Sequence, residues 1–184
     1  MNRHTRFQIL TAFAFITLTG CVVFTRSIGV DEKPSTRDAY IYGRFSMVRT
    51  IDTAFGTHGG MGFEFECENS HQVYTVGFSV DEPLQVIRIP WGDTCSLAHI
   101  VYTDSLGAWA SGKDVPRELR LAIPYKAGKA YYVGDFMGYF GYSSPNMLHW
   151  GLANVRDDFA STTREMKSIF RNMSAIPTEN KMMH

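Results

Sequence analysis

The chain has 184 residues, a length that suits one domain of ordinary size. Hydrophobic residues make up 45% and charged residues 20%, a balance that excludes a disordered chain and a multi-span membrane protein. Because 18 Lys and Arg residues balance 18 Asp and Glu residues, no net field of either sign is available to attract nucleic acid or cations. We therefore expect a globular domain with no nucleic-acid partner.

The first 20 residues have the organisation of a signal peptide. Arg3 and Arg6 precede an apolar stretch over residues 7–18 that contains few polar side chains. This stretch is shorter than the roughly 20 residues that a membrane-spanning helix needs, and its length is typical of the hydrophobic region of a signal peptide. We expect residues 1–20 to be removed by cleavage.

The apolar stretch ends in Leu18-Thr19-Gly20-Cys21, which resembles the lipobox of bacterial lipoproteins. The resemblance implies cleavage before Cys21 and attachment of a diacylglyceryl group to its thiol, so that acyl chains hold the mature protein on a membrane. Lipoproteins retained at the inner membrane typically have Asp after the cysteine, whereas this chain has Val22. The resemblance therefore implies the outer membrane, on its periplasmic face. The alternative is an ordinary signal peptide, or an uncleaved anchor, that happens to contain a cysteine.

The segment that follows the lipobox lacks a sustained hydrophobic period and includes Gly29 and Pro34. We expect residues 21–38 to form the lipidated N-terminus and a flexible tether with a root-mean-square span of about 20–25 Å. The folded domain would then occupy residues 39–176, and residues 177–184 would form a frayed tail.

From residue 39 onward, short apolar or alternating segments are separated by turn residues, which predicts mainly β structure. The clearest alternation places Phe63, Phe65 and Cys67 on one face of a strand and three glutamates on the other. Polar residues at 69–71 should join this strand to the next in a hairpin. We expect a two-sheet antiparallel β-sandwich of about eight strands. The expected strands are residues 39–48, 62–68, 72–80, 84–89, 95–102, 118–123, 129–137 and 148–153.

One helix is expected near the C-terminus. Phe159, Thr163, Met166 and Phe170 recur at helical spacing, with acidic residues in the first turn of the expected helix and basic residues in its last turn. Asn154 is a suitable N-cap residue. We therefore place the helix at residues 155–171, packed on an edge or an end of the sandwich.

The cysteine count agrees with an exported protein. After lipidation of Cys21, Cys67 and Cys95 remain as an even pair in an oxidising compartment. Each lies at the end of a predicted strand and shares a face with apolar neighbours. We expect them to form a disulfide; the alternative is two buried thiols that lie too far apart to bond.

No motif predicts a cofactor, a metal site or a catalytic site, and we expect no enzymatic activity. The glutamates that alternate along residues 64–68 could imitate the paired carboxylates of a glycosidase, but a solvated sheet face explains them more simply. A hydrolase whose groups meet only in the folded protein stays open as an alternative. Four histidines lack metal-ligand spacing: His58, His71, His99 and His149.

The strongest candidate for a binding surface is residues 131–142, in which six aromatic residues are interleaved with three glycines. Because alternation buries only one side of a strand in the core, we expect several of these aromatic residues to be exposed or to lie under a loop. Tyr139, Phe140 and Tyr142 are the candidate contacts for an envelope protein or a glycan. The alternative is a core strand that runs into a hairpin whose tyrosines cover the end of the sandwich.

Residues 127–136, together with Asp157-Asp158-Phe159, resemble a pattern found in poorly characterised bacterial lipoproteins. The resemblance implies a small transthyretin- or immunoglobulin-like sandwich and no activity. We therefore expect a non-enzymatic periplasmic lipoprotein, anchored in the membrane, that binds or scaffolds an envelope component. A glycan- or peptidoglycan-binding module is the first alternative, and a hydrolase is the second.

Overall fold

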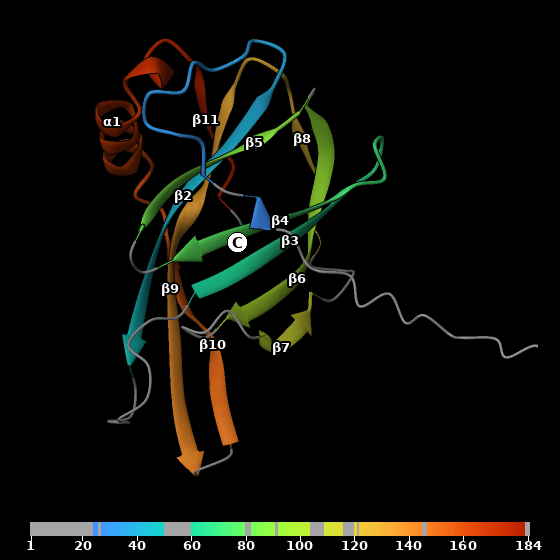
Figure 1. Cartoon of the computed structure of the whole chain (residues 1–184), viewed down its shortest axis with the longest axis vertical. Coiled ribbons are helices and arrows are strands. Elements are labelled where there is room, and N and C mark those ends of the chain that lie inside the picture. Colours follow the sequence, from blue (N-terminus) through green and yellow to red (C-terminus); the bar gives the residue numbers. More distant parts are fainter. Residues whose placement is uncertain are drawn as a thin grey trace, which may run out of the picture.

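The computed structural model describes residues 24–25, 27–49, 60–79, 82–90, 92–103, 109–115, 120, 122–144 and 147–182. Within these residues the chain forms two β-sheets that pack face to face, with one α-helix on the outer side of one sheet (Figure 1). The expected fold class, a mainly β two-sheet sandwich with one C-terminal helix, is confirmed.

The first sheet has the strand order β1-β4-β3-β6-β7, and β8 also pairs with β6. Its strands are β1 (Phe24–Thr25), β3 (Gly60–Cys67), β4 (Val73–Ser79), β6 (Asp93–Thr103), β7 (Trp109–Asp114) and β8 (Ile123–Tyr125). All its pairs are antiparallel except β1 with β4.

The second sheet has the order β10-β9-β2-β5, and β11 also pairs with β9. Its strands are β2 (Ala39–Arg49), β5 (Leu84–Ile89), β9 (Ala130–Ser144), β10 (Met147–Arg156) and β11 (Thr178–Asn180). Both β2 and β11 run parallel to β9, so the sandwich is not antiparallel throughout. These pairs join strands that lie far apart in the sequence, and no local pattern specifies their relative direction.

The hairpin of β3 and β4 forms as predicted. Phe63 and Phe65 are buried and Glu66 is exposed, because side chains alternate along the strand. The Cys67 amide donates a 3.0 Å hydrogen bond to the Gln72 carbonyl and closes the turn. Local alternation and turn residues were sufficient to predict this unit.

Other strands differ from the prediction. The described residues contain eleven strands, and β1, β7 and β11 were not among those expected. The strand placed at residues 118–123 is wrong where it can be compared: Arg120 and Ala122 lie outside any strand, and β8 begins at Ile123. The rest of that range lies outside the described residues.

Two hydrophobic clusters stabilise the fold, one on each face of the second sheet. The first fills the space between the sheets and includes Phe45, Phe63 and Phe136. The second lies between this sheet and the helix and includes Tyr132 and Met166. The second sheet is therefore covered on both faces.

The helix α1 (Phe159–Ile169) is shorter than the predicted range of residues 155–171. Asn154 does not cap it, because β10 continues to Arg156 and Asn154 pairs with Met137 in the sheet. The position before the helix is Asp158, whose side chain makes no capping hydrogen bond. Sheet pairing therefore overrides the local capping signal.

The N-terminal segment lies along the domain instead of forming a free tether. β1 pairs with Thr75 and Val76 of β4. The Ile28 amide then donates a 2.8 Å hydrogen bond to the Val86 carbonyl of β5, and the Ile28 side chain is buried in the second cluster. The expectation of a flexible tether over residues 21–38 is wrong at Phe24–Thr25 and at residues 27–28, which add to the edges of the two sheets.

The C-terminal residues are also ordered into the sheet. β11 pairs with the start of β9, and the Lys181 amide donates a 2.8 Å hydrogen bond to the Tyr132 carbonyl. Lys129 and Glu179 form an ion pair across these strands. The frayed tail predicted for residues 177–184 is therefore wrong over β11, because this strand pairs with residues 130–132 of β9.

Candidate functional site

The aromatic segment forms β9, the strand that lies between β2 and β10. Its pairing with β2 contains a bulge: Tyr42 pairs with Tyr132 and Gly43 pairs with Gly134, which leaves Val133 as the extra residue. Gly134 has a φ of 131°, a value that favours glycine. The bulge shifts the alternation by one residue and places Asp135, like Tyr132, on the helix side of the sheet.

Three of the six aromatic residues belong to the interior. Tyr131 and Phe136 are buried between the sheets, whereas Tyr132 is buried beneath the helix. The outer face of this part of β9 is not exposed, because α1 covers Tyr132. For this part of β9, a core strand is the correct interpretation.

The three candidate contact residues lie together on the distal part of β9. In the pairing with β10, Tyr139, Phe140 and Tyr142 are opposite Gly151, Trp150 and Leu148. Tyr139 is half-buried, and a Cβ atom added at Gly151 would lie 2.9 Å from its hydroxyl oxygen, so its ring lies over this glycine. The side chains of Phe140 and Tyr142 are outside the described part of the structure. Figure 1 shows the β9–β10 hairpin extending at the bottom, beyond the first sheet.

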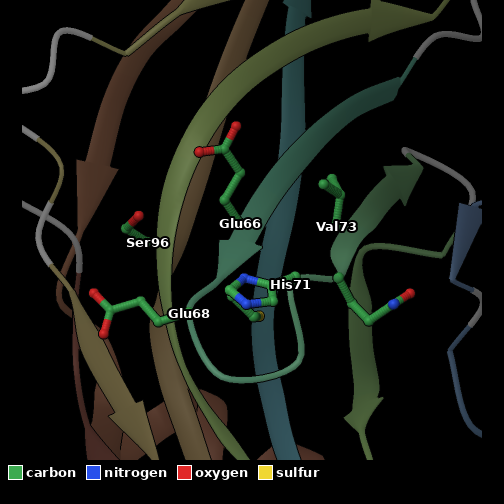
Figure 2. Close-up of a pocket in the computed structure, with 7 residues that line it drawn as sticks. Glu66, Glu68, His71, Val73 and Ser96 are labelled. Atoms are coloured by element: carbon green, nitrogen blue, oxygen red, sulfur yellow. The ribbon is translucent and has the colours of Figure 1, made fainter.

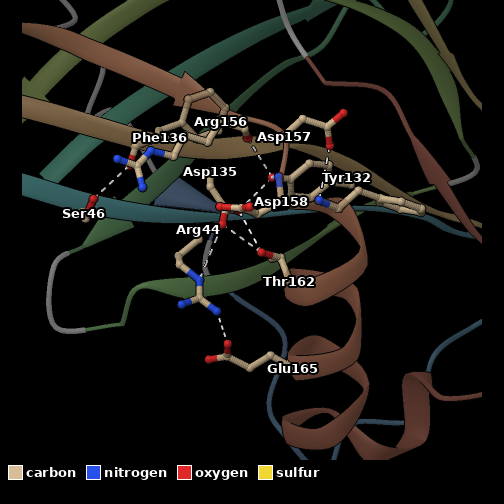
Figure 3. A network of polar contacts seen from close by, with 11 residues as sticks. Arg44, Ser46, Tyr132, Asp135, Phe136, Arg156, Asp157, Asp158, Thr162 and Glu165 are labelled. Atoms are coloured by element: carbon tan, nitrogen blue, oxygen red, sulfur yellow. Dashed lines mark hydrogen bonds and ion pairs between the residues drawn. The ribbon is translucent and has the colours of Figure 1, made fainter.

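A network of polar contacts fills the space between β9 and α1 (Figure 3). The Thr162 hydroxyl lies 3.0 and 2.8 Å from the two carboxylate oxygens of Asp135. The Tyr132 hydroxyl lies 3.0 Å from one of the same oxygens. Because Thr162 is fully buried, Asp135 supplies an acceptor that water cannot replace.

The Tyr132 hydroxyl also fixes the start of the helix. It donates to the Arg156 carbonyl at 2.9 Å and accepts a hydrogen bond from the Asp158 amide at 3.0 Å. Burial raises the pKa of Tyr132 well above its usual range, although the hydrogen bond from Asp158 opposes this effect. The tyrosine therefore stays neutral and holds the strand-to-helix junction.

Arg44 of β2 links the network to the surface of the helix. Its guanidinium contacts Glu165 of α1, and its Nε lies 3.8 Å from an Asp135 carboxylate oxygen. The carboxylates and the guanidinium thus bridge β2, β9 and α1. Neither Arg44 nor Asp135 was identified from the sequence; the available signal was one acidic residue within an aromatic strand.

A second polar site holds the turn between β3 and β4. Asp93 accepts hydrogen bonds from the amides of Asn69 and Ser70 at 3.1 and 2.9 Å and from the Asn69 side chain at 2.7 Å. Burial acts to raise the pKa of Asp93, but the hydrogen bonds from Ser70 and Asn69 outweigh it and hold the pKa well below its usual range. Asp93 is therefore a structural carboxylate, which no local sequence pattern identifies.

Cys67 and Cys95 form a disulfide, as predicted. They lie directly opposite each other in β3 and β6, with their Cα atoms 4.0 Å apart. Cys21, the predicted lipidation site, lies outside the described residues. Within the described part of the chain, no helix has the length and apolar character needed to cross a membrane.

An open depression of about 370 Å³ lies beside this disulfide (Figure 2). Glu66, Glu68, His71, Val73 and Ser96 line it, together with Cys67 and Gln72. The Glu66 carboxylate accepts a 3.1 Å hydrogen bond from the Arg120 guanidinium, so this acid has a structural partner. The paired carboxylates considered from the sequence are thus part of a sheet face that contains ion pairs.

The histidines are dispersed where they can be placed. His71 lines the depression, whereas His99 lies between Glu64 and Asp114 on the face of the first sheet. His58 and the side chain of His149 are outside the described residues. The described residues contain no group of three or more His, Cys, Asp or Glu side chains arranged to hold a metal ion.

Two comparisons with known proteins found no match. No family model matches the chain, and no curated protein matches its sequence.

Proposed function

We propose that this protein is a periplasmic lipoprotein, anchored by Cys21 in the outer membrane, that binds or scaffolds another envelope component without catalysing a reaction. The observation that carries the proposal is the disulfide between Cys67 and Cys95. It uses two of the three cysteines, so that the remaining one is the cysteine of the lipobox. Stable disulfides are typical of exported proteins, which agrees with the signal-peptide pattern.

The proposed contact surface is the distal part of the β9–β10 hairpin. Its backbone extends beyond the first sheet (Figure 1), and it carries Tyr139, Phe140 and Tyr142. Aromatic residues are frequent at the centres of protein interfaces because they bury a large apolar area with little loss of conformational freedom. The buried carboxylate of Asp93 and the partly buried carboxylate of Asp135 have structural partners, which favours binding over catalysis.

The lipid anchor is tested by mass spectrometry of the N-terminal peptide from cell membranes. We expect cleavage before Cys21 and a diacylglyceryl adduct on this residue. The Cys21→Ser variant should accumulate as unlipidated precursor. A wild-type protein with an unmodified Cys21 would refute the anchor.

The partner is tested by photocrosslinking in cells from positions 139 and 142, followed by mass spectrometry. Recovery of the same envelope protein from both positions, and its loss when Tyr139 and Tyr142 are replaced by alanine, would support the scaffold function. A control crosslinker at the exposed Ile169 of α1 should not capture that protein. Capture of the protein from all three positions would refute the proposed surface.

The aromatic hairpin also favours a second candidate, a glycan- or peptidoglycan-binding module. Flat aromatic faces pack against sugar rings as well as against protein side chains. In this case purified peptidoglycan should retain the wild-type protein in a pull-down, and the Tyr139→Ala/Tyr142→Ala variant should lose most of that binding.

A further inference from the structure

The position of β1 bears on how the domain lies at the membrane. β1 begins at Phe24, only three residues after Cys21, and it is fixed to the edge of the first sheet by pairing with Thr75 and Val76. An extended chain spans at most about 3.6 Å per residue, so three residues reach no more than about 11 Å. An acyl group on Cys21 would therefore hold this edge close to the lipid headgroups.

The direction of β1 specifies which end of this sheet edge lies nearest the membrane. Because β1 runs parallel to β4, its N-terminal end faces the start of β4, where the β3–β4 turn lies. We propose that this end of the first sheet, formed by the β3–β4 turn and Val73, is the surface that faces the phospholipid headgroups. The inference rests on the proposed function, because it requires acylation of Cys21.

The exposed residues at this end of the first sheet are suited to contact with lipid headgroups, and they do not favour deep insertion of the domain into the hydrocarbon. Val73 is an apolar side chain that is 56% exposed. Glu68 and His71 beside it are also exposed and belong to the depression of Figure 2. A carboxylate is costly to move into hydrocarbon, so Glu68 should stay in the hydrated headgroup layer while Val73 contacts lipid.

The helix provides a matched reference surface. Ile169 of α1 is 42% exposed, similar to Val73. It belongs to the helix that packs on the outer face of the second sheet, so the second sheet lies between this helix and the first sheet. In Figure 1 the helix lies at the left and the β3–β4 turn lies at the right. The same probe at these two positions therefore reports which side of the domain faces the membrane.

The experiment uses the lipidated protein in vesicles of phosphatidylethanolamine and phosphatidylglycerol. A photoreactive benzoylphenylalanine replaces either Val73 or Ile169, and phospholipid adducts are counted by mass spectrometry. We expect at least fivefold more lipid adduct from position 73 than from position 169. Insertion of ten Gly and Ser residues between Val22 and Val23 should reduce this ratio, because it adds a span of about 16–19 Å.

The same samples distinguish a wrong orientation of the domain from the absence of the lipid anchor. Mass spectrometry of the N-terminal peptide reports acylation of Cys21 independently of the crosslinks. With Cys21 acylated, equal adduct yields from both positions, or a higher yield from position 169, would overturn the orientation and leave the anchor intact. An unacylated Cys21 would refute the proposed function, and the orientation with it.

Discussion

Asp135 connects three elements through a single side chain. Its carboxylate accepts a hydrogen bond from Thr162 of α1 and lies 3.0 Å from the Tyr132 hydroxyl of β9 and 3.8 Å from the guanidinium of Arg44 in β2. These partners lie beneath a helix, where water can replace few of the hydrogen bonds. The cost of losing the carboxylate therefore comes mainly from the groups that would remain without an acceptor.

We expect Asp135→Ala to lower the free energy of unfolding by about 2–4 kcal/mol, because the buried Thr162 hydroxyl loses its acceptor and Arg44 loses a counter-charge. Urea unfolding of the purified mature protein measures this change. The matched control is Asp31→Ala at an exposed position, which should change stability by less than about 0.5 kcal/mol. A similar effect for both variants would contradict the structural role of Asp135.

Asp93 supplies a pH-dependent contribution to stability. Its hydrogen bonds hold the pKa of the folded state below the value of about 3.9 that is typical of an unfolded chain. The unfolded chain therefore binds this proton more readily, so the stabilisation is present above about pH 4 and is lost as the pH falls further.

We expect Asp93→Asn to be less stable than wild type at pH 7 and the difference to shrink below about pH 4. The amide of asparagine offers one acceptor where the turn requires two, so the amides of Asn69 and Ser70 cannot both be satisfied. Urea midpoints at pH 7, 4.5 and 2.5 provide the measurement, and Glu68→Gln at an exposed site is the control. A difference that stays constant across this range would refute the assignment.

At the scale of elements, the bulge in β9 determines which side chains enter each core. Gly43 and Gly134 fit together at this point, since a Cβ atom on Gly43 would lie 2.5 Å from the Gly134 carbonyl oxygen. A Cβ atom on Gly134 would lie 2.8 Å from a methyl group of Val155. The bulge thus depends on two glycines that lie about ninety residues apart in the sequence.

We expect Gly134→Ala to destabilise the protein by about 2–4 kcal/mol, from an unfavourable φ together with overpacking against Val155. Thermal and urea unfolding measure the loss. Gly29→Ala is the matched control, because the nearest atom to an added Cβ atom there is 3.9 Å away. Equal stability of the two variants would show that the bulge tolerates a side chain.

The elements predicted correctly are those that depend on local pattern. Alternation along 63–68 was sufficient for β3 and for its hairpin with β4, and it placed Cys67 on the buried face. The bulge at Gly134, the parallel pairing of β2 with β9 and the late start of α1 could not be predicted in this way. Each of them depends on a partner strand or a covering helix that is remote in the sequence.

The candidate site shows the same division. The aromatic composition of residues 131–142 was correctly recognised as unusual, but the burial of Tyr132 depends on α1, whose contact with β9 has no local signal. Asp93 and Asp135 were missed for a related reason. A structural carboxylate is identified by the amides and hydroxyls around it, and these come from other elements.

For the whole molecule, the disulfide between Cys67 and Cys95 links the two strands that form the middle of the first sheet. The two cysteines are 28 residues apart, and the loop that they close contains β4 and β5. Closing this loop removes conformations from the unfolded chain more than it adds contacts to the folded one.

We expect the Cys67→Ala/Cys95→Ala variant to be less stable than the oxidised wild type by about 3–4 kcal/mol, the value that loop closure predicts for this separation. Urea unfolding with and without reductant measures the effect. Reductant should destabilise the wild type and leave the double variant unchanged. A loss below about 1 kcal/mol would contradict the loop-closure estimate.

The position of β9 has a consequence for the order in which the protein folds. This strand pairs on one side with β2, near the beginning of the domain, and on the other side with β11, among the last described residues. The second sheet therefore has a high contact order, which is associated with slow folding. A ribosome or a secretion channel delivers β11 after the other described strands, so this part of the sheet can close only once they have all emerged. Until then residues 130–132 of β9 stay open on this side to pairing with other chains, and a chaperone that shields exposed strand edges would have its greatest effect in this interval.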